Sequence, residues 1–496
     1  MQDYSRLPEE PRQFGFYLDG EWVARGSRDR IERISPAHGT PVTYAVRCTP
    51  EDLDDGVAAA HRAFRMGSWS EISGAERAAV LLDAAAGIRD RHDEIAYWET
   101  LETGKPITQS RTEVEAAAGY YEYAAGVART LKGDAFNNLG PDMMGLVTRQ
   151  PIGVIGLITP WNFPFIILAE RIPFMLAAGC TIVAKPSEFT SASTLIMAEI
   201  LTEAGLPDGA FNVITGYGAD VGQAMIEHDD IAVLSFTGSI GVGRKVVLAS
   251  VSNLKKLSLE LGGKNPQIVY ADADLDNAAD GVVFGLLFNA GQCCVSGSRL
   301  IVERSIARDF ETLIKEKFAR VRLGDPLDPA TQVGAMVTPE HQKKVLNYVE
   351  QGVSEGSTLS CGGKSYSAPI DQFVEPTLLT GVRNDMTVAR EEIFGPVLAM
   401  IEFDTLDEAV EIANDNDFGL AASIWTKDID KAIRTMRRVQ AGRTWVNTTI
   451  AGGPELPIGG FKQSGTGRET GVYGVEEYTE LKSIHISLGK RDHWVG

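Results

Sequence analysis

Five short apolar segments that alternate with helical patterns constrain the fold of this chain more than any other feature of the sequence. The segments span residues 154–158, 181–184, 211–215, 232–236 and 256–260, and helical periodicity fills 165–179, 191–204, 219–228 and 239–250 between them. The first segment carries no polar side chain, so its strand is expected to be buried on both faces of a sheet. The alternation predicts an α/β fold with a parallel, doubly wound sheet, which binds nucleotides beyond the carboxyl ends of its strands.

A second alternating series follows and predicts a second α/β domain. Strands are expected at 298–303, 397–403, 420–425 and 443–447, with helices at 306–319, 339–353, 406–415 and 429–439. Ahead of the first sheet, 16–23 predicts a hairpin, and 50–65, 74–100 and 111–131 predict a layer of helices. Residues 143–148 and 483–488 are isolated strands that could pair with each other and present an edge to another subunit.

Composition and charge exclude several kinds of partner. The 496 residues include 47 basic and 67 acidic side chains, and the net charge of −20 repels nucleic acid and anionic membranes. The chain shows no signal segment, no apolar span of about twenty residues, and no metal-ligand spacing among its seven histidines. Five cysteines without a regular framework suit a reducing compartment. We therefore expect a cytoplasmic protein without a bound metal and without a nucleic acid or membrane partner.

Two adjacent cysteines lie where a predicted helix gives way to a strand. Residues 275–288 carry a helical pattern, Gly291 breaks it, and a strand begins at Arg299, so Cys293 and Cys294 are expected in the connecting turn. A side chain at such a turn can project into a cleft, where an accessible thiolate is a nucleophile. Free cysteine is also among the most buried residue types, so a pair of structural thiols is the alternative.

Polar side chains near the ends of three predicted strands could serve a reaction in the same cleft. Asn162, in a loop fixed by two prolines, offers an amide donor for an oxyanion or satisfies its own loop. Glu188 follows the second strand, where a carboxylate can bind ribose hydroxyls or meet the dipole of the next helix. Glu260 ends the fifth strand beside two glycines and could be a general base or an ordinary exposed strand glutamate.

Two further segments could hold a nucleotide. Residues 236–243 form a glycine-rich turn between a strand and a helix, which suits a pyrophosphate but departs from the G-x-G-x-x-G spacing. Glu392 and Phe394 are two positions apart on a strand-like segment, so they share a face and could hold a sugar and stack on a ring, or pair at a sheet edge.

Taken together, these motifs resemble the aldehyde dehydrogenase superfamily in kind and order, from about residue 16 to the tail. The shared segments are Trp161-Asn162, 185–188, Phe-Thr-Gly-Ser at 236–239, Glu-Leu-Gly-Gly-Lys at 260–264, Gly-Gln-Cys-Cys at 291–294, Glu-Glu-Ile-Phe-Gly-Pro at 391–396, and 457–469. The resemblance implies a hydrolytic, NAD(P)-dependent enzyme that forms a homodimer or homotetramer. It also implies an NAD-binding domain (1–130 and 150–262), a catalytic domain (263–463) and an oligomerisation arm (131–149 and 464–496).

The resemblance further implies a role for each motif residue. Cys294 would attack an aldehyde to form a thiohemiacetal, with Asn162 and the Cys294 backbone N–H stabilising the oxyanion. After hydride transfer to the nicotinamide, water activated by Glu260 would hydrolyse the thioester to the acid, and Glu469 matches a glutamate near the proton route. The implied cofactor contacts are Ile158, Trp161, Lys185, Glu188, Gly238, Ser239, Leu261, Glu392 and Phe394. NAD is expected over NADP, with NADP weaker, because Glu188 occupies the place of a 2′-phosphate.

The substrate is the least constrained part of the prediction. By analogy with family positions, Phe163, Phe165, Glu170 and Phe288 are expected to line an acyl tunnel. Glu170 and Thr449 stand where many members have aromatic residues, which argues against a choline-derived aldehyde. Glu170 could instead favour polar or cationic aldehydes, or pair with a basic group such as Arg171.

Two other functions fit the same fold. One is a coenzyme A-acylating semialdehyde dehydrogenase, in which a thiol replaces water at the thioester. Members of that kind typically lack a glutamate at the position of Glu260, so its presence argues for hydrolysis. The other is a catalytically silent nucleotide-binding protein, against which the presence of Cys294, Glu260 and Asn162 argues.

Overall fold

The five predicted strands form the centre of an eight-stranded sheet in the computed structural model, which describes residues 4–24, 29–491 and 494–495. They are β8 (Val154–Ile158), β9 (Thr181–Lys185), β10 (Phe211–Val213), β11 (Val233–Thr237) and β12 (Lys256–Glu260). Their order is β12-β11-β8-β9-β10 with every neighbouring pair parallel, so the doubly wound prediction is confirmed. The order reverses at β8, which opens a crevice at the carboxyl ends of β8 and β11. Residues 1–3, 25–28, 492–493 and 496 of the predicted domain ranges lie outside the described residues.

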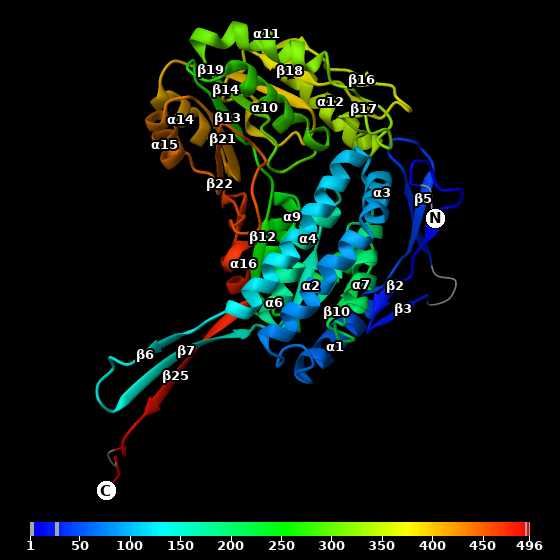
Figure 1. Ribbon diagram of the computed structural model, residues 1–496. Coiled ribbons are helices and arrows are strands. Elements are labelled where there is room, and N and C mark those ends of the chain that lie inside the picture. Colours follow the sequence, from blue (N-terminus) through cyan, green and yellow to red (C-terminus); the bar gives the residue numbers. More distant parts are fainter. Residues whose placement is uncertain (1–3, 25–28, 492–493, 496) are drawn as a thin grey trace.

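Helices cover both faces of this sheet (Figure 1). One buried cluster joins the sheet to α2 (Gly74–Asp90), α3 (His92–Thr103), α4 (Ile107–Thr130), α5 (Pro164–Ala169), α6 (Ile172–Ala178) and α7 (Ala192–Glu203). The opposite face packs on α1 (Pro50–Arg65), η1 (Gly218–Gly222), α8 (Gln223–Glu227) and α9 (Ile240–Ala249).

Two of the helices predicted from periodicity are each divided in the structure. The helix expected at 74–100 breaks at Arg91, which leaves the helical conformation between α2 and α3. The helix expected at 165–179 breaks at Glu170 and Arg171, because Pro173 has no N–H to continue the hydrogen-bond ladder. At this second break the side chain of Arg171 is buried, with its Nε 3.8 Å from a carboxylate oxygen of Glu469.

Short strands extend the first sheet beyond the predicted five. The hairpin of β2 (Phe16–Leu18) and β3 (Glu21–Val23) is confirmed, with a left-handed turn at Asp19 and Gly20, and it joins the sheet through β10. At the other edge β24 (Gly465–Thr466) pairs with β12. A separate small sheet of β1 (Arg12–Gln13), β4 (Arg30–Ile34) and β5 (Pro41–Val46) was not predicted.

The second series also forms one sheet, which confirms the second α/β domain. Its order is β15-β18-β19-β14-β13-β21-β22, with all pairs parallel except β15 with β18. The strands are β13 (Pro266–Val269), β14 (Arg299–Glu303), β15 (Thr358–Cys361), β18 (Thr377–Thr380), β19 (Val397–Phe403), β21 (Ala421–Trp425) and β22 (Arg443–Val446). Its helices are α10 (Leu275–Leu287), α11 (Ala307–Phe318), α12 (Pro339–Ser354), α13 (Thr387–Arg390), α14 (Leu406–Asn414) and α15 (Ile429–Arg438). β13, β15 and β18 were not predicted, since they are short and flanked by irregular segments.

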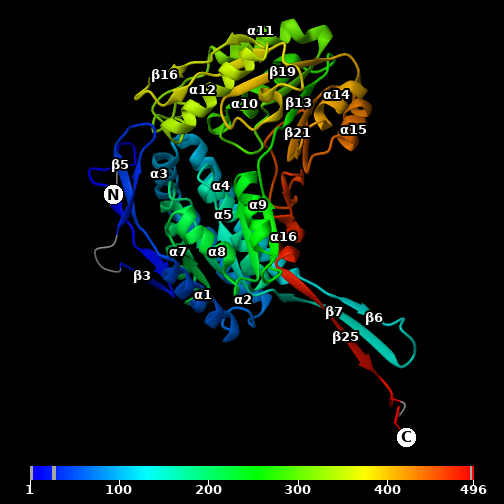
Figure 2. The same ribbon diagram turned by 180° about the vertical axis from the view of Figure 1, so that it is seen from behind.

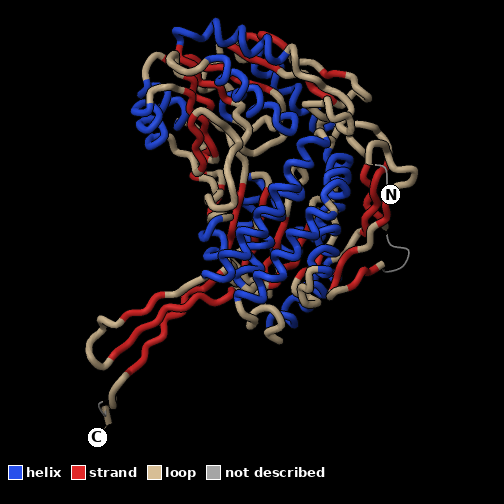
Figure 3. Tube along the Cα trace, in the orientation of Figure 1, coloured by secondary structure: helices blue, strands red, loops and turns tan. Residues whose placement is uncertain are grey.

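The two isolated strands pair with each other, as predicted, in an arm that extends from the body (Figures 1 and 2). β7 (Met143–Pro151) and β25 (Thr479–Ser487) are antiparallel along their whole length, and β6 (Asp134–Phe136) adds a third strand. Figure 3 shows that the arm is built of strands without helices. The arm strand begins only at Thr479, because β24 belongs to the first sheet and α16 (Gly471–Glu477) packs on α6. None of the helices in the described part of the chain combines the length and apolarity that crossing a bilayer would need.

Candidate active site

The thiol pair lies on a strained turn between the two domains. After α10, the short 3₁₀ segment Phe288–Gly291 places Asn289, Ala290 and Gly291 in left-handed conformations with φ of 50°, 55° and 73°. Gly291 is required there, because a Cβ at this position would lie 2.3 Å from the carbonyl carbon of Gly395. The turn therefore packs directly against the segment that carries the predicted Glu392 and Phe394.

Side-chain amides fix the backbone on both sides of Cys294. Asn162 Nδ2 donates to the Gln292 carbonyl at 3.0 Å, and Asn289 Nδ2 donates to the Asn162 carbonyl at 2.9 Å. Asn265 Nδ2 donates to the Cys294 carbonyl at 2.8 Å, a contact that the sequence analysis missed. The available signal for Asn265 was its place directly after the Glu-Leu-Gly-Gly-Lys motif. Cys293 is buried whereas Cys294 is partly accessible, so only the second thiol is presented to the site.

A cavity of about 260 Å³ brings the predicted residues of both domains together. Its lining includes nine of them, namely Trp161, Asn162, Gly238, Ser239, Glu260, Leu261, Cys294, Glu392 and Phe394. His341 and Lys344 on α12 also line it, and the helical pattern of α12 gave no signal for either. The His341 ring contacts Trp161 and Phe394 edge to face, and burial lowers the pKa of His341 to about 4, so the ring is neutral. The predicted Ile158, Lys185, Glu188 and Glu469 lie outside this lining.

Both reactive groups in the cavity hold their protons strongly. Burial raises the pKa of Glu260 to about 8, against the opposing charge of Arg171, and Glu260 Oε1 has no hydrogen-bond partner. The pKa of the Cys294 thiol is raised well above its usual range, first by its hydrogen bond with Cys293 and then by burial. Because the carboxylate holds its proton less strongly than the thiol, Glu260 becomes ionised first as the pH rises.

The carboxyl ends of the first sheet offer a fitting cradle for a dinucleotide. Ser239 caps α9 by accepting a hydrogen bond from the Val242 N–H, so the N-terminus of α9 faces the cavity. The carboxylate of Glu392 accepts a 3.0 Å hydrogen bond from the Gly263 N–H, and a Cβ on Gly262 would lie 2.2 Å from it. Thr237 Oγ1 is buried without a partner at the end of β11. The residues present therefore fit a pyrophosphate and an adjacent ribose.

Lys185 and Glu188 lie at the same edge of the sheet, beyond the cavity. Lys185 ends β9 with its Nζ 3.5 Å from a Glu188 carboxylate oxygen, and burial lowers the pKa of the lysine. Glu188 remains 27% exposed and can accept further hydrogen bonds. Ile158 ends the neighbouring β8. This arrangement at the carboxyl ends of the strands suits a second ribose.

An apolar wall borders the thiols away from the nucleotide cradle. It consists of Phe163, Ile166, Ile167, Phe288, Cys293, Val295, Leu420, Ala421, Trp445 and Ile450. Phe163 and Phe288 stack with their centroids 5.6 Å apart. The expectation for Phe165 is wrong, because it is 1% exposed and packs in the core under α4 and α7. Thr449 is likewise buried, with its hydroxyl bound to Ser423.

The two remaining predicted glutamates are both close to Arg171. Glu170 lies 3.4 Å from Arg171 Nη1, so the pairing alternative describes its contact, and its role in substrate choice stays a prediction. Glu469 is fully buried, 3.8 Å from Arg171 Nε, and accepts a 2.6 Å hydrogen bond from Ser258. Its place near a proton route also stays a prediction.

Comparison with known proteins identifies the family. Residues 22–484 match the model of the aldehyde dehydrogenase family. A betaine aldehyde dehydrogenase of Bacillus subtilis is 40% identical over 95% of this chain and 96% of its own length. The structure of an NAD-dependent aldehyde dehydrogenase from Sinorhizobium meliloti is 47% identical, with a TM-score of 0.96 over 98% of this chain and 96% of that one. A betaine aldehyde dehydrogenase from Staphylococcus aureus in complex with NAD+ is 35% identical, with a TM-score of 0.95 over 97% of each chain. The chain thus belongs to the aldehyde dehydrogenase family, and it is an NAD-dependent enzyme that oxidises aldehydes.

Proposed function

We propose that Cys294 is the nucleophile, Asn162 the oxyanion donor and Glu260 the base of this reaction. The observation that carries the proposal is that these three side chains, from three separate elements, line one cavity beside the nucleotide cradle. Ser239, Glu392 and Phe394 would hold NAD there, together with Lys185 and Glu188 at the sheet edge. Bound NAD supplies the acceptor for the hydride that leaves the aldehyde carbon.

The protein's own groups account for the remaining steps. The Cys294 thiol releases its proton to solvent water, and the sulfur bonds to the aldehyde carbon. The oxygen that becomes negative is stabilised by the Asn162 amide and the Cys294 backbone N–H. Once the hydride has left, the carbon is a thioester. Glu260 then takes a proton from water, the water oxygen bonds to the thioester carbon, and the Cys294 sulfur leaves. The test is to trap the acyl-enzyme in the Glu260→Gln variant and map its added mass to the Cys294 peptide.

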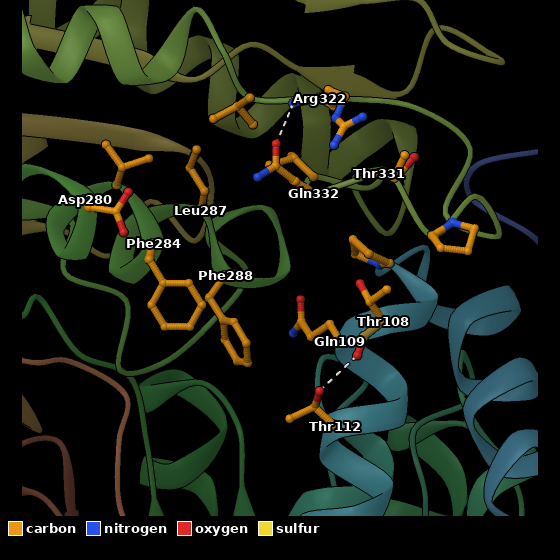
Figure 4. Close-up of a pocket in the computed structure, with 16 residues that line it drawn as sticks. Thr108, Gln109, Thr112, Asp280, Phe284, Leu287, Phe288, Arg322, Thr331 and Gln332 are labelled. Carbon is orange, nitrogen blue, oxygen red and sulfur yellow. Dashed lines mark hydrogen bonds between the residues drawn. The ribbon is translucent and has the colours of Figure 1, made fainter.

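For the substrate we infer an uncharged aldehyde with an apolar or aromatic chain. Figure 4 shows a second cavity, of about 510 Å³, with Phe284 and Phe288 on one side, and Phe288 also stacks on Phe163 of the apolar wall, so we infer that a chain approaches the wall past Phe288. Phe284, Leu287 and Val333 line that cavity, and Gln109 and Thr112 of α4 face them. Such a mostly apolar approach favours the transfer of hydrocarbon from water.

A quaternary ammonium aldehyde is disfavoured, although some relatives are betaine aldehyde dehydrogenases. Such a substrate would need free aromatic faces near the thiol. The Lys105 ammonium already lies 4.3 Å from the Phe163 centroid, and the Arg443 guanidinium lies 5.1 Å from that of Trp445. Glu170 is paired with Arg171.

We accordingly expect kcat/KM for straight-chain and aromatic aldehydes to exceed that for betaine aldehyde by about tenfold, the value of one lost cation–π contact. The measurement is NADH formation across a panel of aldehydes at one ionic strength. Glu170→Ala should change stability without changing the ratio of cationic to alkyl substrates. A ratio that falls in this variant would show that Glu170 attracts cationic aldehydes, and a wild type that prefers betaine aldehyde would contradict the proposal.

The cofactor preference follows from Glu188, and we expect NAD to be used about one to two orders of magnitude better than NADP in kcat/KM. A 2′-phosphate beside this carboxylate is repelled by about 4 kcal/mol at an effective dielectric near 20, before solvent screening. Lys185, 3.5 Å from Glu188, offsets part of the repulsion. Glu188→Ser should narrow the gap by improving the use of NADP, whereas Glu203→Ser, on the exposed end of α7, should leave it unchanged. Equal use of both cofactors by the wild type would refute this role.

We also infer that the chain assembles through its arm into a dimer or tetramer. β25 is the edge strand of the arm sheet, so one side of its backbone is free to pair, and Leu481 on it is 62% exposed. We propose the division into an NAD-binding domain, a catalytic domain and an oligomerisation arm from the two large sheets and the separate arm sheet. Cys180, Cys293, Cys294 and Cys361 are free thiols, which supports a reducing compartment such as the cytoplasm.

A further inference from the structure

A hydrogen-bonded cluster around Glu469 is not used by the steps described above. Glu469 Oε1 accepts hydrogen bonds from Ser258 Oγ at 2.6 Å and from Tyr478 Oη at 2.7 Å, and Tyr478 Oη lies 2.8 Å from Oε2. Glu469, Ser258 and Tyr478 are all buried. Burial raises the pKa of the Tyr478 hydroxyl well above its usual value, so this group remains a donor throughout the neutral range.

This cluster is directly connected to the base. Ser258 and Glu260 are two positions apart on β12 and share a face of the sheet. Burial is the largest cause of the raised pKa of Glu260. The next two causes are the charge of Arg171, which lowers this pKa, and that of Glu469, which raises it. The charged and titratable groups that act on Glu260 or Glu469 are Glu170, Arg171, Cys294, Arg468, Glu477 and Tyr478.

The same cluster is connected to the root of the arm. Tyr478 is the residue immediately before β25, and its carbonyl accepts hydrogen bonds from the Ile152 N–H at 3.2 Å and the Cys180 thiol at 3.3 Å. Ile152 follows directly after β7. The backbone of Tyr478 is therefore fixed where both long arm strands leave the body, while its hydroxyl contacts Glu469 in the interior.

We propose that Tyr478 is a positioning residue that ties the root of the arm to the base Glu260, because its hydroxyl holds the Glu469 carboxylate in place beside Arg171. The inference rests on the proposed role of Glu260. Glu469 and Arg171 together set how readily Glu260 takes a proton from water. A displacement of the arm root would move the Tyr478 hydroxyl and so change the rate of deacylation, without any contact with the substrate.

The test is the pH profile of deacylation in Tyr478→Phe. The enzyme is acylated with p-nitrophenyl acetate, which needs no cofactor, and the loss of the acetyl group is followed by intact mass. Without the Tyr478 hydroxyl, the Glu469 carboxylate loses the hydrogen bonds to both of its oxygens, so it is held less closely in the cluster and its negative charge acts less on Glu260. In Tyr478→Phe we expect the acid limb of the deacylation profile to shift to lower pH by about 0.5 to 1 pH unit. At a pH on this limb, the variant should then lose the acetyl group about 3- to 10-fold faster than the wild type. Glu469→Gln should shift the limb in the same direction and at least as far.

Tyr121→Phe is the matched control, because the buried Tyr121 hydroxyl on α4 has no hydrogen-bond partner. Its limb should coincide with that of the wild type. If Tyr478→Phe does not fold, Ser258→Ala removes the 2.6 Å donor and gives the same test. The inference is overturned, and the proposed function stands, if deacylation is blocked in Glu260→Gln while the acid limb of the deacylation profile is unshifted in Glu469→Gln and in the folded donor variant, Tyr478→Phe or Ser258→Ala. Normal deacylation by Glu260→Gln would overturn both the inference and the proposed function.

Discussion

The Glu260→Gln variant is expected to produce one burst of NADH, equivalent to the enzyme present, and then to fall nearly silent. An amide cannot take a proton from water, so the thioester on Cys294 persists while the earlier hydride transfer proceeds. We expect steady-state turnover to fall by about two to four orders of magnitude. Intact mass should show the acyl group, and peptide mapping should place it on Cys294.

The pH dependence of the wild type provides an internal check on this result. Because the pKa of Glu260 is about 8, its ionised fraction is small at lower pH and grows as the pH rises through that value. Deacylation by the wild type should therefore accelerate with pH across this range, and the residual rate of Glu260→Gln should not show that limb. A variant that turns over normally would mean that another group activates water.

Cys294→Ser is expected to lower aldehyde oxidation by about three orders of magnitude or more, whereas Cys293→Ser should retain most of it. A serine hydroxyl is a far weaker nucleophile than a thiolate near neutral pH. Cys293 is 5% exposed and packs in the apolar wall, so its replacement removes a neighbour of the nucleophile without removing the nucleophile.

The pair of cysteine variants is informative because each is the control for the other. NAD binding and the melting temperature, measured alongside NADH formation, show whether each variant is folded and holds its cofactor. Equal loss of activity in the two variants would contradict the assignment of Cys294.

Local sequence patterns predicted an element correctly where its surroundings are the same along its whole length. Strands β8, β9 and β11 are short, mostly apolar runs buried on both faces, and sequence patterns recognise such runs. Residues 165–179 were predicted as one continuous helix, because the apolar pattern continues through Pro173 near the middle of the segment. Its break at Glu170 and Arg171 is a backbone effect, and this break is what brings Arg171 to Glu469.

The site was predictable to the extent that its residues lie in recognisable motifs. Cys294, Asn162 and Glu260 were each ambiguous alone, and only their common order with a known family favoured a catalytic role, which stays a prediction. His341 and Lys344 could not be found, because they lie on an ordinary amphipathic helix that reaches the cavity only through the tertiary packing of α12. Asn265 was missed for a related reason, since its contact with the Cys294 carbonyl joins segments 29 positions apart.

The contact between Gly291 and Gly395 limits how this enzyme can diversify. With backbone against backbone and no room for a methyl group, the turn that carries the proposed nucleophile and the segment that carries Glu392 and Phe394 keep a fixed spacing. A mutation in either segment that altered this spacing would disturb chemistry and cofactor placement together, and selection would remove it. The aromatic residues of the apolar wall are not bound by that constraint. If these residues contact the substrate as proposed, new substrates can be acquired at Phe163, Phe288 or Trp445 while the oxidation itself is inherited unchanged.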